Sequence, residues 1–325
     1  MKCLFLMVLV GALPVHWVAV GQSQVLFGSK IFPVNGNAAI WQDDEGDEDE
    51  HLLGGAVQRR PTQAIPKDPF LVTNVLTDER YPPFPKYLSS CGIVLAATEG
   101  VSDEFLLHVG RAIDEVFARR DGLDLEAQRR VVADLHAYGA LLPVPRTERS
   151  FERLLRRDER SFDRLHREYS ICDIIMAQVP EGQVMEVVEH VLHTVTDVGL
   201  HYQFPKEWGL SRESELWKAM QFAIDKGYYN IESYDDLGNE PREIVDRILL
   251  QEFAYWFITT AWDLQVPYGP GEDEWTLRTA ADLKAKMPEF FAVYQRTAAR
   301  VMSAPSPETL AKIGPTRSEE RRRQR

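Results

Sequence analysis

Carboxylate and imidazole side chains recur at helical spacing in the stretch Glu186–Asp197, where the remaining residues are valine, leucine and threonine. In a helix, Glu189, His193 and Asp197 lie four residues apart on one face, with His190 beside them. Burying such groups in apolar surroundings is costly unless they are paired, hydrogen-bonded or bound to a metal ion. We therefore take this stretch as the candidate site.

Glu189 and His193 have the spacing at which two side chains of one helix reach a single metal ion. A third ligand has to come from another element. Glu252 is the candidate, because it is the only carboxylate in the apolar run Ile248–Ile258 and needs a partner there. One histidine and two carboxylates suit Zn²⁺ or another divalent first-row metal, and they leave a position for water. These residues predict a metal site built from two helices.

Each part of this site also has a purely structural explanation. The acids and the histidine of the first helix can form a polar ladder in the core, in which each i, i+4 pair contributes about 0.2–0.5 kcal/mol. Glu252 can instead form an ion pair with Arg242 or Arg247 of its own helix. Both explanations stay open at the level of the sequence.

The order of predicted elements indicates an α+β fold, with a small sheet near the start and helices after it. Ser102 followed by two acids is typical of a helix N-terminus, and Phe151 and Phe162 share one helical face because they are eleven residues apart. The predicted strands are 91–97, one or two within 131–144, and 173–179. The predicted helices are 102–119, 149–167, 186–198 (ended by Gly199), 213–226, 242–264 and 286–303.

The segment Glu189-His190-Val-Leu-His193 resembles the metal-binding helix of the zincin metallopeptidases, with a glutamate in place of the first histidine ligand. Zincins place a small mixed sheet and a helix before this helix, and those with a glutamate as third ligand take it from a later helix, as Glu252 would be here. The resemblance implies a zincin-like fold with a metal on Glu189, His193 and Glu252, and a metallopeptidase or a catalytically silent relative.

His190 occupies the position at which zincins carry the glutamate that takes a proton from the metal-bound water. An imidazole can act as the catalytic base there, but it can also ligate the metal or hydrogen-bond to Glu186. The stretches 94–103 and 189–197 also resemble a family of secreted, largely uncharacterised proteins. That second resemblance covers about residues 88–303 and implies no particular chemistry.

The chain is predicted to be secreted, with one globular domain between two disordered ends. Residues 1–21 have the charge, the apolar core and the small final residues of a secretory signal peptide. Residues 22–87 are acidic and proline-rich and are predicted to be disordered, residues 88–303 to fold, and residues 304–325 to form a disordered basic tail. Whether 22–87 is a removed propeptide stays open.

The acidic run Asp43–Glu50, with seven acids in eight positions, supports a second hypothesis. Clustered carboxylates suit Ca²⁺ or a mineral surface, as in a non-enzymatic extracellular matrix protein, although a solvated linker explains the run more simply. The net charge of −13 argues against nucleic acid and anionic membranes as partners, which leaves an unknown protein or peptide. Cys91 and Cys172 can form a disulfide or remain two buried thiols.

Overall fold

The computed structural model describes residues 23–27, 30–34, 52, 54, 56–238, 240–271 and 273–323. The predicted signal peptide 1–21 and the acidic run 43–50 lie outside these residues, so the fold does not test the hypotheses of secretion and of calcium binding. None of the helices in the described part of the chain combines the length and the apolar character that a bilayer crossing requires.

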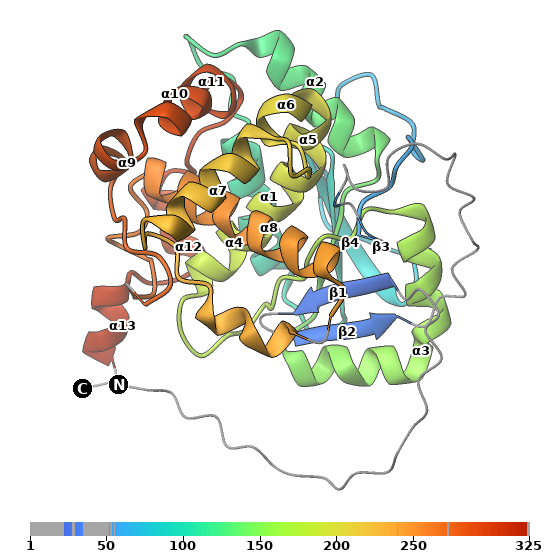
Figure 1. The fold of residues 1–325 in the computed structure, drawn as a ribbon. Helices are drawn as coiled ribbons and strands as arrows, with labels where there is room; N and C mark the ends of the chain where they lie inside the picture. The colour runs from blue at the N-terminus through green and yellow to red at the C-terminus, as the bar shows by residue number, and fades with distance from the viewer. Residues whose placement is uncertain are drawn as a thin grey trace, which may run out of the picture.

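A four-stranded mixed sheet forms one part of the fold, with the strand order β3-β4-β5-β6 (Figure 1). Its strands are β3 (Leu76–Tyr81), β4 (Phe84–Ser90), β5 (Ile93–Ala97) and β6 (Leu141–Val144). The first three are antiparallel neighbours, whereas β5 and β6 are parallel, because the connection between them is a long crossover that contains helices. Two further strands, β1 (Ser23–Phe27) and β2 (Lys30–Val34), pair with each other. The predicted α+β class is confirmed.

Alternate residues of the sheet face two different apolar cores, as the two-residue period of a strand requires. Ile93 and Leu95 of β5 belong to the main core, which the helices of the larger part of the fold also line. Ala96 faces the opposite way and packs in a smaller core with Phe151 and Phe162. These two phenylalanines belong to α3 (Glu148–Glu168), the predicted 149–167 helix. The sheet therefore separates α3 from the helices that carry the candidate site.

The other helices include the two that position the candidate ligands, α4 (Gln183–Thr194) and α8 (Arg242–Ala261). These two pack against each other near the centre of the view in Figure 1. A π-helix, η1 (Val195–Leu200), continues α4, and a 3₁₀-helix, η2 (Glu232–Leu237), precedes α8. The remaining helices are α1 (Asp103–Val116), α2 (Leu125–Ala137), α5 (His201–Gln203), α6 (Pro205–Trp208), α7 (Glu215–Asp225), α9 (Ala280–Lys286), α10 (Pro288–Arg296), α11 (Ala298–Val301), α12 (Pro307–Ile313) and α13 (Arg317–Arg323).

One predicted strand region is wrong and another is only partly right, because β6 is a strand within 131–144 but the start of that range is helical. Residues 131–137 belong to the helix α2, because Asp124 caps its first turn through the backbone N–H of Ala127, and the valines that suggested a strand pack on the core face of that helix. Residues 173–179 are extended but form no strand. Their backbone donates only two hydrogen bonds to the end of β6 and just beyond it, from Ile175 to Pro143 and from Ala177 to Pro145. Tertiary packing overrides β-propensity in both places.

Both ends that the sequence predicted to be disordered contain regular structure. The range 22–87 holds β1, β2, β3 and the start of β4, and Tyr81 and Phe84 of its proline-rich run are buried. The range 304–325 holds α12 and α13, and Leu310 and Ile313 of α12 are buried in the main core. Isolated apolar residues in these polar stretches form too short a pattern to predict burial. Their burial depends on contacts with residues that are distant in the sequence.

Cys91 and Cys172 are both buried and unpaired, which is the second of the two arrangements that the sequence left open. Cys91 forms the turn between β4 and β5 together with Gly92, and both residues have positive φ, 45° and 86°. A Cβ atom at Gly92 would lie 2.7 Å from the carbonyl oxygen of Val132, so glycine lets α2 pack closely against this turn.

Candidate metal centre

Helices α4 and α8 bring together the three residues that the sequence selected as metal ligands. Glu189, His193 and Glu252 each offer a ligand atom, and these atoms all lie within 4.8 Å of one another. Glu189 and His193 are one turn apart on α4. Glu252 faces them from α8, a helix that is buried on almost every side between Asp246 and Thr260.

The imidazole of His193 is the innermost of the three groups and is fully buried. Its Nε2 atom lies 3.6 Å from Oε2 of Glu252 and has no hydrogen-bond partner. That separation is too long for a good hydrogen bond. Two ligands held about 2.0–2.1 Å from one ion in tetrahedral geometry, however, are about 3.4 Å apart. The distance therefore fits two ligands of one metal ion better than a direct contact.

The two carboxylates approach this nitrogen from a side that stays partly open, since the side chain of Glu252 is 13% exposed and Glu189 is also only half-buried. Burial and the neighbouring charge of Glu252 raise the pKa of Glu189 to about 8. For His193, burial acts to lower the pKa, but the Glu252 carboxylate and the hydrogen bond to Asp173 together raise it to about 10. The two carboxylates therefore resist ionising side by side, and a divalent cation bound between them would favour their ionised forms and a neutral imidazole.

The other ring nitrogen of His193, Nδ1, faces a second polar group. It lies 2.7 Å from Oδ2 of Asp173 and 2.8 Å from Nε2 of Gln251. Asp173, His190 and His193 also offer three ligand atoms close together, all of them buried. The amide of Gln251 covers Nδ1 on that side, however, whereas the buried Nε2 has no hydrogen-bond partner. The group of Glu189, His193 and Glu252 is therefore the better candidate for a metal ion.

His190, the predicted catalytic base, contacts two carboxylates outside the candidate ligand group. Its Nδ1 lies 2.9 Å from Oδ2 of Asp173, and its Nε2 lies 3.3 Å from Oε1 of Glu186. Burial opposes protonation of this ring, but the charges of Asp173 and Glu186 raise the pKa of His190 well above its usual value. The structure thus has the Glu186 contact that the sequence gave as one alternative.

The predicted polar ladder is incomplete, because Asp197 leaves the face that carries Glu189 and His193. The chain widens into the π-helix η1 directly after α4, and this change of period turns the carboxylate of Asp197 toward Arg247, 3.9 Å away. Gly199 does not end the helix as predicted. A Cβ atom there would lie 2.9 Å from Cγ1 of Val131, so Gly199 serves the contact between η1 and α2.

The arginines proposed as ion-pair partners of Glu252 have other neighbours. Arg247 is buried, and its Nη1 donates to Oε1 of Gln251 at 3.0 Å. Arg242 lies 3.7 Å from Asp246. Among the described residues, neither arginine is paired with Glu252. Oε2 of Glu252 instead lies 3.6 Å from Nε2 of His193, within the candidate metal group.

Sequence reasoning missed Asp173, which lies at the centre of the polar contacts behind His193. Burial opposes its ionisation, yet the charges and hydrogen bonds of His190 and His193 hold the pKa of Asp173 below its usual range. A detectable signal existed, because Asp173 is the only acid in the apolar run Ile171–Met176. A lone acid in an apolar run is the same signal that selected Glu252. Asp173 was not selected because residues 173–179 were predicted to form a strand.

The ring of Tyr255 lies beside His193, and a further carboxylate, Glu274, is close enough to sense the charge of Glu252. Tyr255 is fully buried, and burial and then the charge of Glu189 raise the pKa of its phenol well above the usual value. The carboxylate of Glu274 accepts hydrogen bonds from Tyr234 at 2.6 Å and from Trp256 at 2.9 Å. The carboxylate of Glu274 therefore receives its hydrogen bonds from Tyr234 and Trp256, which both stay protonated.

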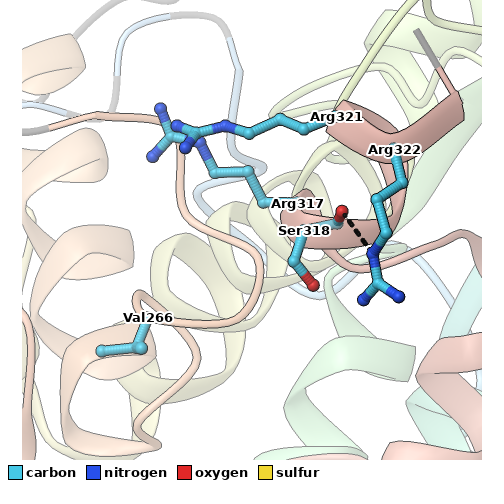
Figure 2. Close-up of a pocket in the computed structure, with 5 residues that line it drawn as sticks. All are labelled: Val266, Arg317, Ser318, Arg321 and Arg322. Atoms are coloured by element: carbon cyan, nitrogen blue, oxygen red, sulfur yellow. Dashed lines mark hydrogen bonds between the residues drawn. The ribbon is translucent and has the colours of Figure 1, made fainter. Parts of the chain in front are cut away.

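A separate hollow of about 390 Å³ lies at the C-terminal helix α13, away from these ligands. Figure 2 shows Arg317, Arg321, Arg322 and Ser318 around it, with Val266 across from them. The side chain of Arg317 is fixed by a hydrogen bond from Nη1 to the carbonyl oxygen of Gly269. The hollow shares no residue with the candidate metal centre.

Comparisons of the chain with protein-family models, with curated proteins and with solved structures found no match. The chemistry of the site therefore has to be inferred from its geometry: a buried histidine and two partly exposed carboxylates, arranged so that they could hold one metal ion.

Proposed function

We propose that this chain is a secreted, zincin-like protein that binds Zn²⁺ through Glu189, His193 and Glu252. The observation that carries the proposal is the buried Nε2 atom of His193, which has no hydrogen-bond partner and lies 3.6 Å from a carboxylate oxygen of Glu252. A buried polar atom without a partner is costly, and a metal ion would satisfy this one. The ligand set of one imidazole and two carboxylates favours zinc over magnesium or calcium, which prefer oxygen ligands alone.

A zinc ion in this position would leave a coordination site on the partly exposed side, where it could act as a Lewis acid toward water or a carbonyl oxygen. Glu189, His193 and Glu252 would hold the ion, and the ring of Tyr255 lies edge-on to the imidazole of His193. Peptide hydrolysis also needs a base close to the metal. His190 contacts Asp173 and Glu186 instead. We therefore favour a metal-binding protein over an active metallopeptidase.

The test is the metal content of the purified, secreted full-length protein, measured by elemental mass spectrometry. The wild-type protein is expected to hold about one zinc ion per chain. The near-isosteric variants Glu189→Gln, His193→Gln and Glu252→Gln are expected to lose it while keeping the same circular dichroism spectrum.

Glu274→Gln is the matched control, because Glu274 lies in the same acidic surroundings but outside the candidate ligand group. It is expected to keep its zinc. A wild-type protein that stays free of metal after incubation with zinc would overturn the proposal, and so would ligand variants that keep zinc at the wild-type level.

A further inference from the structure

Nδ1 of His193 faces Asp173 and Gln251, on the other side of the ring from the candidate metal position. These two contacts determine which ring nitrogen carries the proton. We propose that Asp173 is a positioning residue, which accepts a hydrogen bond from Nδ1–H of His193 and thereby leaves the lone pair of Nε2 free to bind the metal. The inference rests on the proposed zinc site and assigns a role to a residue that would not touch the metal. A carboxylate behind a metal-binding histidine commonly fixes its tautomer and orientation.

The distances around His193 place its proton on Nδ1. Oδ2 of Asp173 lies 2.7 Å from Nδ1, within good hydrogen-bonding range, and both side chains are buried. A carboxylate can only accept, so this contact requires a proton on Nδ1. In the neutral ring the other nitrogen, Nε2, then carries the lone pair. That lone pair faces the space between Glu189 and Glu252.

Gln251 allows a competing arrangement, in which its amide donates a hydrogen bond to Nδ1 of His193. Its Oε1 accepts from Nη1 of Arg247 at 3.0 Å, which fixes the orientation of the amide and directs Nε2 toward His193 and Asp173. This Nε2 lies 2.8 Å from Nδ1 of His193 and 3.4 Å from Oδ2 of Asp173. If it donated to Nδ1, the ring proton would move to the other nitrogen and block metal binding.

The charge of Asp173 decides between the two arrangements. A hydrogen bond from Nδ1–H to a carboxylate is charge-assisted and about twice as strong as a neutral one from an amide. The alternative would leave the carboxylate oxygen facing a nitrogen lone pair at 2.7 Å, which is repulsive. In this arrangement the amide of Gln251 has to turn its hydrogens away from Nδ1–H, which is 2.8 Å away, and toward Oδ2 of Asp173, which is 3.4 Å away. Nδ1 of His190 lies 2.9 Å from the same oxygen and is a further neighbour of this carboxylate.

The experiment compares zinc affinity, by competition with a chelator, in the full-length wild-type protein and in Asp173→Asn. The variant keeps the shape but lacks the charge, so zinc should bind about 10–100-fold more weakly. The zinc-bound wild type should also show a strongly downfield Nδ1–H proton for His193 in its NMR spectrum, and this signal should shift or disappear in the variant. Asp163→Asn, at another buried aspartate, on α3, should change neither reading.

A second substitution separates positioning from a merely structural effect. Gln251→Glu places a carboxylate beside Nδ1, still next to Arg247. The double variant Asp173→Asn with Gln251→Glu should therefore bind zinc about tenfold more tightly than Asp173→Asn alone. If Asp173→Asn does not fold, Gln251→Glu alone is informative and should stay within about threefold of the wild-type affinity. A gain above about tenfold would mean that Nδ1 accepts from Gln251 in the wild type, and would overturn the proposal.

The outcomes distinguish failure of the zinc site from failure of the positioning role of Asp173. Wild-type protein that binds no zinc overturns the metal site and the role of Asp173 with it. Wild-type protein that binds zinc, together with an Asp173→Asn variant of equal affinity and an unchanged Nδ1–H signal, leaves the metal site intact and overturns only the positioning role.

Discussion

Nε2 of His193 lies 3.6 Å from Oε2 of Glu252, although the two residues belong to different helices and are far apart in the sequence. The separation is close to the distance between two ligands of one tetrahedral ion. The same ring is held from behind by Asp173 at 2.7 Å. The buried ring of His193 thus lies between Glu252, which would bind the metal, and Asp173, which would not.

Zinc should stabilise the protein through this pair. A ligand that binds only the folded state at about 100 times its Kd adds about 2.7 kcal/mol to the free energy of unfolding. We expect zinc to raise the melting temperature of the wild-type protein after treatment with a chelator, and to leave that of Glu252→Gln unchanged. Differential scanning fluorimetry measures both, with Glu274→Gln as the variant that should respond like the wild type. An equal rise in Glu252→Gln would contradict the prediction.

The dependence of stability on pH should reflect Asp134 in α2. Burial raises the pKa of its carboxyl to about 6 against the opposing charge of Arg130, from an ordinary value of 3.8. Ionisation is therefore penalised in the folded state, so the stability present below pH 3.8 is lost as the pH rises through 6. Asp134→Asn should be more stable than the wild type at pH 7.5, by about 1 kcal/mol after allowing for its partial exposure. Urea denaturation should show no such difference near pH 4.

The contact between η1 and α2 depends on a glycine. A Cβ atom at Gly199 would lie 2.9 Å from Cγ1 of Val131 and 3.4 Å from Cγ of Leu135. Gly199→Ala should therefore lower the free energy of unfolding by about 1–3 kcal/mol. Val131→Ala in the same chain removes the opposing methyl groups and should recover part of the loss. If the two substitutions are simply additive in chemical denaturation, the two residues do not constrain each other.

The segment before the sheet should contribute to the stability of the core, even though its sequence is typical of a linker. Val57 is 3% exposed, and the adjacent Gln58 donates hydrogen bonds to Ser170 and to the carbonyl oxygens of His166 and Tyr169. Val57→Ala should cost about 1–3 kcal/mol of unfolding free energy. Ile65→Ala is the control, because Ile65 is 52% exposed and should change it by less than about 0.5 kcal/mol. Equal effects in urea denaturation would mean that the segment does not support the core.

The sequence by itself determined the α+β class, many of the longer helices and the identities of three candidate ligands. Helical spacing is a local property, so it placed Glu189 and His193 on one face of α4 without knowledge of the fold. Glu252 was found because a single acid in an apolar run needs a partner, whichever partner that is. These inferences needed only the period of a helix and the cost of burying charge.

Only the tertiary structure decided which groups complete the site. Asp173 reaches His193 from an extended segment that precedes α4, and Gln251 from a distant helix. The π-helix η1 turns Asp197 away from the ligand face toward Arg247, and His190 faces Asp173 and Glu186. Such choices depend on which side chains distant in sequence meet in the core, and the burial and hydrogen bonding that select among them exist only once the chain has folded.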